Sequence, residues 1–440
     1  MSLDPSPEKK AKLQRVELPR VRDEVVWARK VDDELKKMDI LNSLEDEKKL
    51  KEEFIKLPRL LTPKYDMQLT RFRFTTADPQ WPLLPLMLRS GMAQLVREIK
   101  ARLADPSEKS VYVTGHQGCG KSFALYAAVC FFRRGRAKYR VTYIPDCGEW
   151  LIKPWDYLYG ALAATFYDDE VETREGGKKT IVELLEEMAM RVQVTMNQPF
   201  ETTRQETVKE LFEVLERYAK SKNLQWIFVM DQQNRIRSQN KTGEYPFSLS
   251  ENFGFPQKRL RVVSASANNQ IADSYHKPFK FGTRTPQYTQ TEFKLVMDDA
   301  KIINDQQRLE IEVATNRIPF YVSEVLNRLH DQKKTLKQAL KDFEICMTES
   351  FQETNMNFRK NPNIDLDCFF LSATHMILCL PFESIGHIHF GSCDRQLTMI
   401  REDSKTKKLF LEPVIPCALR VIQSMLETRR NFESSNEPVK

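Results

Sequence analysis

The sequence predicts an α/β fold in which helices cover both faces of a parallel β-sheet, and three observations support this. Short apolar segments alternate with helical segments between residues 108 and 310, as in sheets whose crossover connections are helices. The apolar segment "VYVTG" leads through a glycine-rich loop into the helical segment "KSFALYAAVCFF". In the segment "LQWIFVMDQQN" (224–234), an apolar run ends at the acidic residue Asp231. Both apolar segments are therefore expected to be central strands.

Composition limits the class of protein. A chain of 440 residues is long enough for two or three domains. The formal net charge of +7 permits an acidic partner but does not require one. None of the eight cysteines forms a C-x-x-C pair, so neither a zinc ribbon nor a thioredoxin-like site is predicted. The sequence contains no secretory h-region and no run of about 18 apolar residues. We expect a soluble intracellular protein without a membrane partner.

The chain divides into four predicted regions. They are a charged, partly disordered helical arm (1–60), a lead-in segment (61–107), an α/β core (108–310) and a C-terminal domain (311–440).

The N-terminal arm is predicted to contain two helices. The apolar stripe of the first consists of Trp27, Val31, Leu35 and Met38. The second begins at Ser43 as its N-cap, with an apolar stripe of Leu44, Leu50, Phe54 and Leu57. Two interpretations are open: the helices pack on the body of the protein, or they form an arm for a protein partner or for self-association.

The lead-in segment and the core continue the pattern. The segment "PLLPLMLRSGMAQLVREIKARLADPSEKS" is predicted to be a helix before the first core strand. A second strand covers residues 140–147 and follows the basic turn "RRGRAKYR", which is either a solvated surface or a nucleic-acid contact. Further helices are expected over 150–166, 181–194 and 203–220, and a further strand over 259–270.

The C-terminal domain has a different character. Helices are predicted over "NRIPFYVSEVLNRLH" and onward to about Phe358, and the helix "PCALRVIQSMLETRR" closes the chain. The segments "LDCFFLS", "IGHIHFG" and "KKLFLE" are predicted to be short strands. We expect a helical or winged-helix-like α+β domain.

The loop after "VYVTG" has the pattern G-x-x-x-x-G-K-S of a phosphate-binding loop. Glycines allow backbone N–H groups to approach a polyphosphate, and the N-terminus of the following helix attracts the same anion. Lys121 is predicted to contact the β- and γ-phosphates, and Ser122 to bind Mg²⁺. The predicted nucleotide-binding residues are Gly115, His116, Gln117, Gly118, Cys119, Gly120, Lys121, Ser122 and Phe123.

The strand ending in Asp231 supplies the second half of such a site. Asp231 is predicted to hold the water shell of Mg²⁺, so ATP and Mg²⁺ are the expected cofactors. Gln232 stands where motor ATPases usually have the glutamate that activates water, and an amide accepts no proton at neutral pH. Hydrolysis is therefore expected to be slow or to rely on another group. Asn268 and Ser266 are candidates to sense the γ-phosphate or to orient the attacking water, with strand-end capping as an equal alternative.

Other classes fit less well. The segment "NKTG" lacks the aspartate that reads guanine, no L-S-G-G-Q signature occurs, and the C-terminal domain is unlike that of a small-molecule kinase. His387, His389 and Cys393 lack a fourth metal ligand with convincing spacing, so ordinary packing or exposure is the expected role of these residues. A nuclease core cannot be assembled from residues 360–440.

"YIPDCGEWL" (143–151), the phosphate loop and "VMDQQN" together resemble the P-loop ATPase domain of the Crinkler and retrotransposon-hot-spot proteins, which is related to the AAA+ and STAND groups. The resemblance implies that Asp231, Gln232 and Asn234 form the second nucleotide motif. "NRIPFYV" is similar to the G-x-P element after the family's core, with Asn316 in place of glycine. The resemblance also implies nuclear action on DNA or chromatin.

Three functions follow. The first is a Mg-dependent ATPase acting on DNA, chromatin or a protein complex, and the second is a slowly hydrolysing, nucleotide-gated switch or scaffold, in either case as a monomer or an oligomer. The third, with less support, is a nuclease-linked effector. We expect a nuclear or cytoplasmic location; translocation as an effector would have to proceed without a signal peptide.

Overall fold

The computed structural model describes most of the chain between residues 21 and 435. The described ranges are 21–46, 50, 53–62, 83–105, 110–115, 118–152, 154–172, 177–194, 200–233, 260–265, 279–281, 287–330, 332–359, 398–402, 409–413 and 415–435.

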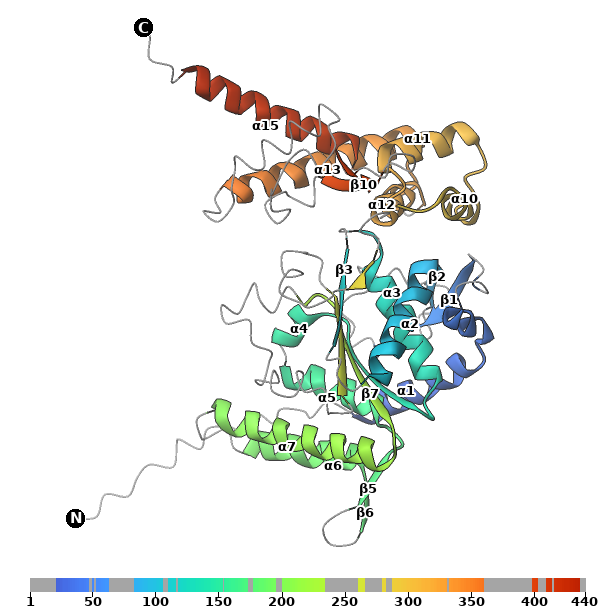
Figure 1. Ribbon diagram of the computed structural model, residues 1–440, viewed down its shortest axis with the longest axis vertical. Coiled ribbons are helices and arrows are strands. Elements are labelled where there is room, and N and C mark those ends of the chain that lie inside the picture. Colours follow the sequence, from blue (N-terminus) through green and yellow to red (C-terminus); the bar gives the residue numbers. More distant parts are fainter. Residues whose placement is uncertain are drawn as a thin grey trace, which may run out of the picture.

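The centre of the fold is a five-stranded sheet (Figure 1). Its strands, in spatial order, are β4 (Tyr139–Ile144), β7 (Gln225–Met230), β8 (Leu260–Ala265), β3 (Ser110–Thr114) and β9 (Phe279–Lys280). All four neighbouring pairs are parallel. The α/β fold with a parallel sheet is therefore confirmed. Because the strands are parallel, β3 and β7 end at the same edge of the sheet, with β8 between them.

Both faces of the sheet are buried. In β7, Ile227 and Val229 belong to one core cluster, whereas Trp226, Phe228 and Met230 belong to another, as the two-residue period of a strand requires. The helices α2 (Ser90–Ala104) and α3 (Lys121–Arg134) cover the first face. The other face is covered by α4 (Cys147–Ile152), α5 (Pro154–Thr165), α6 (Ile181–Val194) and α7 (Phe200–Ser221).

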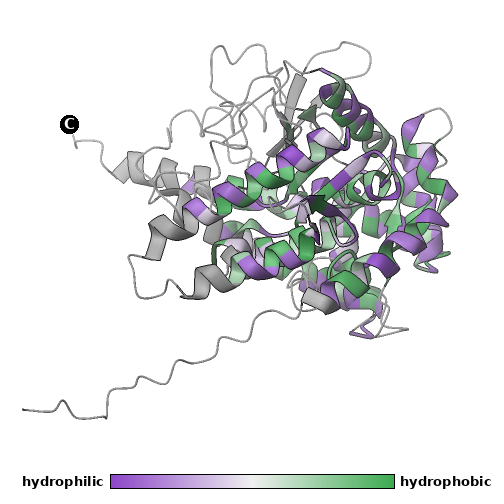
Figure 2. Ribbon diagram, turned by 90° about the horizontal axis from the view of Figure 1, so that it is seen from below, coloured by the Kyte–Doolittle hydropathy of each residue, from purple (hydrophilic) through white to green (hydrophobic). Residues whose placement is uncertain are grey.

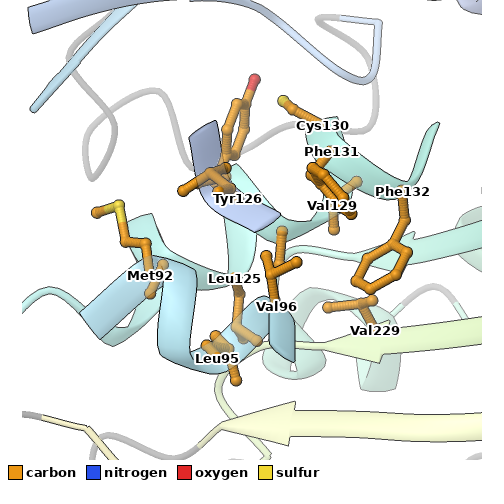
Figure 3. Close-up of a cluster of buried hydrophobic side chains, with 14 of the residues drawn as sticks. Met92, Leu95, Val96, Leu125, Tyr126, Val129, Cys130, Phe131, Phe132 and Val229 are labelled. Atoms are coloured by element: carbon orange, nitrogen blue, oxygen red, sulfur yellow. The ribbon is translucent and has the colours of Figure 1, made fainter. Parts of the chain in front are cut away.

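Helix α3 is held between α2 and the sheet (Figure 3). Leu95 and Val96 of α2 pack near Leu125 and Val129 of α3, and Val229 of β7 completes the cluster. Every residue from 124 to 132 is buried, so α3 has apolar surroundings on all sides. Its N-terminus is consequently fixed relative to the end of β3.

The N-terminal region differs in part from the prediction. Helix α1 covers Val21–Lys36, and the 3₁₀ helix η2 (Asp39–Glu45) follows it. Instead of a second helix, Phe54–Pro58 forms strand β1, which pairs antiparallel with β2 (Leu83–Met87). The predictions of a helix through Leu57 and of one beginning near residue 82 were wrong. Pairing between the two short apolar segments satisfies the hydrogen-bonding groups of their backbones. In segments this short, the apolar spacing fits the period of a strand as well as that of a helix.

Helix α1 packs on the body of the protein. Val31 and Leu35 of its predicted stripe are buried, and so is Ala28. Residues of α1 contact both α3 and α5. The described part of the arm therefore follows the first of the two interpretations, packing on the core.

The first and last arginines of the basic turn "RRGRAKYR", Arg133 and Arg140, are buried rather than solvated. Arg133 is 7% exposed and donates from Nε to Oδ1 of Asp32 at 2.8 Å. Arg140 is 8% exposed and donates to both oxygens of Asp169 at 2.6 Å. The prediction of a solvated basic surface was wrong here, because buried carboxylates neutralise these guanidinium groups.

The C-terminal helices form a third core cluster. Figure 1 shows them gathered beyond the edge of the sheet at which β3 ends. In Figure 2, which views the molecule from below, the helices in front carry hydrophobic residues next to hydrophilic ones. The elements are α10 (Gln290–Asp299), α11 (Asp305–Thr315), α12 (Pro319–His330), α13 (Leu336–Arg359), β10 (Thr398–Glu402), β11 (Leu409–Pro413) and α15 (Pro416–Ser435).

The predicted strands "LDCFFLS" and "IGHIHFG" lie outside the described residues. Strand β11 coincides with the predicted "KKLFLE" segment and pairs antiparallel with β10. A small antiparallel pair, β5 (Glu170–Glu172) with β6 (Lys178–Thr180), completes the described strands. Among the described helices, none is long and apolar enough to cross a membrane.

Candidate functional site

The glycine-rich loop lies between the end of β3 at Thr114 and the start of α3 at Lys121. Gly115 and residues 118–120 are described; His116 and Gln117 are not. The loop thus occupies the strand-to-helix position at the carboxyl edge of the sheet. Ligands of open α/β sheets bind at this edge.

Gly115 is required by the close approach of another segment. A Cβ atom at this position would lie 1.8 Å from the carbonyl oxygen of Phe281. The Phe281 N–H donates to the carbonyl of Thr114 at 2.7 Å. Any side chain at Gly115 would therefore separate the segment after β9 from the end of β3.

Lys121 and Ser122 lie in the first turn of α3, and both are buried. Nζ of Lys121 donates to the carbonyl of Gly115 at 2.7 Å, so the ammonium group lies inside the loop. The first N–H groups of a helix have no partner within the helix and attract anions. The loop combines a cation, a hydroxyl and a helix N-terminus, which is the donor set of a phosphate site.

Two other residues of the predicted nucleotide-binding set, Cys119 and Phe123, make contacts with the interior of the protein. The thiol of Cys119 is buried and lies 3.5 Å from the carbonyl oxygen of Phe281. Phe123 is half-buried and packs against the first core cluster. Their side chains thus support the shape of the loop.

Asp231 directly follows β7 and is only 1% exposed. Its Oδ1 accepts the backbone N–H of Gln232 at 2.8 Å. β7 and β3 are separated by β8, so two strand spacings, about 10 Å, separate Asp231 from the loop strand. Ser122 and Asp231 are the hydroxyl and carboxylate ligands that suit Mg²⁺ beside a phosphate loop.

Gln232 has an unusual backbone conformation, with φ of 61°. This left-handed conformation costs a non-glycine residue about 1–2 kcal/mol, and the side chain is buried at 5% exposure. Strained positions of this kind concentrate at functional sites. Gln232 thus occupies a buried left-handed turn directly after Asp231.

Several predicted residues lie outside the described residues, namely Ser266, Asn268, His116, Gln117, Asn234, His387, His389 and Cys393. Within the part of the chain that is described, no group of three or more His, Cys, Asp or Glu side chains is placed to hold a metal ion.

Arg89, which precedes α2, is a contact of the loop that the sequence did not indicate. Its Nη1 donates to the carbonyl of Cys119 at 3.1 Å, its Nη2 to the carbonyl of Gln287 at 2.9 Å, and its Nε to Glu292 at 2.9 Å. The guanidinium carbon lies 5.1 Å from the ring centroid of Tyr288. Burial raises the pKa of Tyr288 to about 12, so this phenol is neutral at physiological pH. Gln287 and Glu292 lie about 200 residues after Arg89, so no local sequence pattern indicates these contacts.

A family model described as mitochondrial ribosomal death-associated protein 3 matches residues 86–240, which include the loop and Asp231. The match covers about a third of the chain, less than is needed to assign the chain to that family. No curated protein matches the sequence.

Among solved structures, a Walker-type ATPase of Pyrococcus abyssi is 12% identical with a TM-score of 0.43, covering 75% of this chain and 95% of that one. Drosophila ORC bound to DNA is 10% identical with a TM-score of 0.31, covering 76% and 85%. The Aeropyrum pernix ORC1 protein in complex with DNA is 9% identical with a TM-score of 0.33, covering 78% and 93%. Similarities this distant do not identify a family.

Proposed function

We propose that this chain binds Mg-ATP in the loop at residues 115–122 and hydrolyses it. The observation that carries the proposal is the placement of Lys121, Ser122 and Asp231 along one edge of a parallel sheet. When bound, Mg²⁺ would supply positive charge that neutralises the terminal phosphates. Lys121 would hold the same phosphates, Ser122 would bind the metal, and Asp231 would orient its water shell.

The proposal predicts that Asp231→Asn lowers Mg-dependent ATP turnover by about 10–100-fold, because groups that orient the ligands of a metal typically contribute this much to activity. Asparagine still accepts the N–H of Gln232, so ATP affinity should change less than about tenfold. Phosphate release by full-length protein, with and without DNA, measures the effect. Asp299→Asn, at an exposed position in α10, is the matched control. Turnover above half of the wild-type rate in Asp231→Asn would contradict the metal role.

A nucleotide-gated switch is the second candidate function, and contacts between the loop and the C-terminal helices favour it. The N–H of Phe320, at the start of α12, donates to the carbonyl of Gly118 at 3.2 Å. Gly118 has φ of 80°, and a Cβ there would lie 2.8 Å from Cβ of Phe320. Arg89 binds the next carbonyl of the loop and also Glu292 of α10. A shift of the loop on phosphate binding would therefore be transmitted to α10 and α12.

The switch hypothesis predicts that Arg89→Ala uncouples the phosphate loop from α10. ATP should still bind, but ATP-dependent protection of α10 in hydrogen exchange should fall by at least half, because the side-chain connection to Glu292 is gone. Helix α12 keeps its backbone contact with Gly118 and should keep its protection. Loss of this partly buried pair of Arg89 and Glu292 should also lower the free energy of unfolding by about 1–3 kcal/mol. Arg97→Ala, an exposed position on α2, is the control. Unchanged protection in Arg89→Ala would argue against this route of coupling.

The remaining predictions are part of this proposal. The predicted start of the C-terminal domain near residue 311 leaves out α10, which packs in the same core cluster as the later helices. We infer that the domain includes α10 and is winged-helix-like; its described part, helices with one antiparallel strand pair, is compatible with this. The similarity of "YIPDC" and "DQQN" to Crinkler and retrotransposon-hot-spot ATPases supports nuclear action on DNA or chromatin. The name of the matching family model instead supports a mitochondrial ribosomal setting. Turnover measured with DNA and with ribosomal particles separates these two settings.

A further inference from the structure

Asp146 lies beside Asp231 because of an irregularity at the end of the pairing between β4 and β7. The last regular partners are Ile144 and Met230. The N–H of Asp231 donates to the carbonyl of Ile144 at 2.9 Å, and the N–H of Cys147 donates to the carbonyl of Asp231 at 3.1 Å. Regular parallel pairing would use the N–H of residue 146 for the second bond. Residues 145 and 146 therefore oppose Asp231 together.

Such an insertion is a β-bulge, a feature that redirects side chains and is frequent next to active sites. It brings a second buried carboxylate to the same edge of the sheet, since Asp146 is 6% exposed and Asp231 is 1% exposed. Oδ1 of Asp146 accepts the N–H of Gly148 at 2.7 Å at the start of α4. That bond is a helix cap, which a neutral asparagine or serine provides as well. Asparagine or serine at position 146 can therefore keep the cap while removing the carboxylate.

A group that accepts a proton from the attacking water accelerates hydrolysis. The amide of Gln232 has no such capacity. Asp231 is assigned to the metal's water shell in the proposed function, on which this inference rests. Asp146 is the buried acid nearest to Asp231 by backbone pairing, on the side of β7 away from β8. A triphosphate extending from Lys121 toward Asp231 would point its terminal phosphate at this pair.

We propose that Asp146 is the catalytic general base of ATP hydrolysis. The water oxygen forms a bond to the γ-phosphorus while the bond from that phosphorus to the β–γ bridging oxygen breaks. The electron pair of the broken bond stays on ADP. One proton of the water passes to the Asp146 carboxylate and is then released to solvent, leaving ADP, inorganic phosphate and the original carboxylate.

The test compares Mg-ATP affinity and turnover in full-length wild-type protein, Asp146→Asn and Glu149→Gln. Asparagine keeps the cap to Gly148 and removes the base. We expect the turnover of Asp146→Asn to fall by about 100-fold or more, the usual range for a general base, with affinity unchanged within about threefold. Asp146→Ser, a second capping variant, should show the same loss. Glu149, a partly buried acid in the first turn of α4, serves as the control and should keep its turnover.

Three results would overturn the assignment: Asp146→Asn with near wild-type turnover, parallel loss of ATP affinity and turnover in both capping variants, or selective loss of turnover in Glu149→Gln. Wild-type protein that binds Mg-ATP without hydrolysing it would overturn both the base and the hydrolytic activity. Wild-type protein that does not bind Mg-ATP would overturn the proposed function itself.

Discussion

Replacing Lys121 with alanine is expected to weaken Mg-ATP binding by about 100-fold or more. The ammonium group lies inside the loop, 2.7 Å from the carbonyl of Gly115, and the residue is 6% exposed. A charge-assisted hydrogen bond contributes about 1.5–3 kcal/mol, and each 1.4 kcal/mol is a factor of ten in affinity. Loss of contacts to both the β- and γ-phosphates therefore removes most of the affinity.

Isothermal titration calorimetry with Mg-ATP measures this change. Lys138→Ala is the matched control, because Lys138 is exposed and precedes β4 at the opposite edge of the sheet. The control should bind ATP as the wild type does. Equal affinities of Lys121→Ala and Lys138→Ala would show that the loop does not hold the phosphates.

Replacing Asp32 with alanine is expected to lower the free energy of unfolding by about 3–5 kcal/mol, the usual cost of breaking a buried ion pair. Asp32 is 1% exposed and binds Arg133 at 2.8 Å. The hydroxyl of Tyr167 also donates to this carboxylate, at 3.0 Å. The substitution leaves the guanidinium of Arg133 buried at the C-terminal end of α3 without its carboxylate, although the carbonyls of Leu60 and Ala28 still accept from it.

Urea unfolding of the full-length protein checks this prediction. The adjacent Asp33 forms an exposed pair with Lys36, in which the aspartate side chain is 56% exposed. Asp33→Ala should therefore change stability by less than about 1 kcal/mol. A loss in Asp32→Ala no larger than in Asp33→Ala would show that α1 is not anchored through this pair.

Local sequence patterns predicted the central part of the fold well. A strand, a glycine-rich loop and a helix in direct succession predicted β3 and α3, and the apolar segment before Asp231 predicted β7. These elements are predictable because residues close together in the sequence determine them. Strand β7 is apolar from Trp226 to Met230, Gly115 permits the close approach of Phe281, and α3 is apolar on all sides.

Other features depend on partners far away in the sequence. The segment at 54–58 was predicted to be helical because its apolar spacing suits a helix, and only its pairing with β2 makes it a strand. The charges of "RRGRAKYR" suggested a solvated surface. Asp32, which neutralises Arg133, lies about a hundred residues earlier, so no local pattern indicates this ion pair.

The same limit applies to the candidate site. In the sequence, Asp146 is distinguished only by the "YIPDC" similarity, and its position beside Asp231 arises from the bulge between two strands. Arg89 carries no motif, because its contacts are with the carbonyls of Cys119 and Gln287 and with Glu292. Sequence patterns indicate the phosphate loop and the metal carboxylate, whereas tertiary pairing determines which other groups surround them.

Calorimetric titration of the full-length wild-type protein with ATP, with and without Mg²⁺, is the most direct test of the central claim that residues 115–122 and Asp231 form a nucleotide site. We expect one site per chain, with tighter binding when Mg²⁺ is present, because Ser122 and Asp231 act through the metal. Absence of binding up to about 1 mM Mg-ATP, the upper end of ordinary enzyme affinities, would contradict the claim.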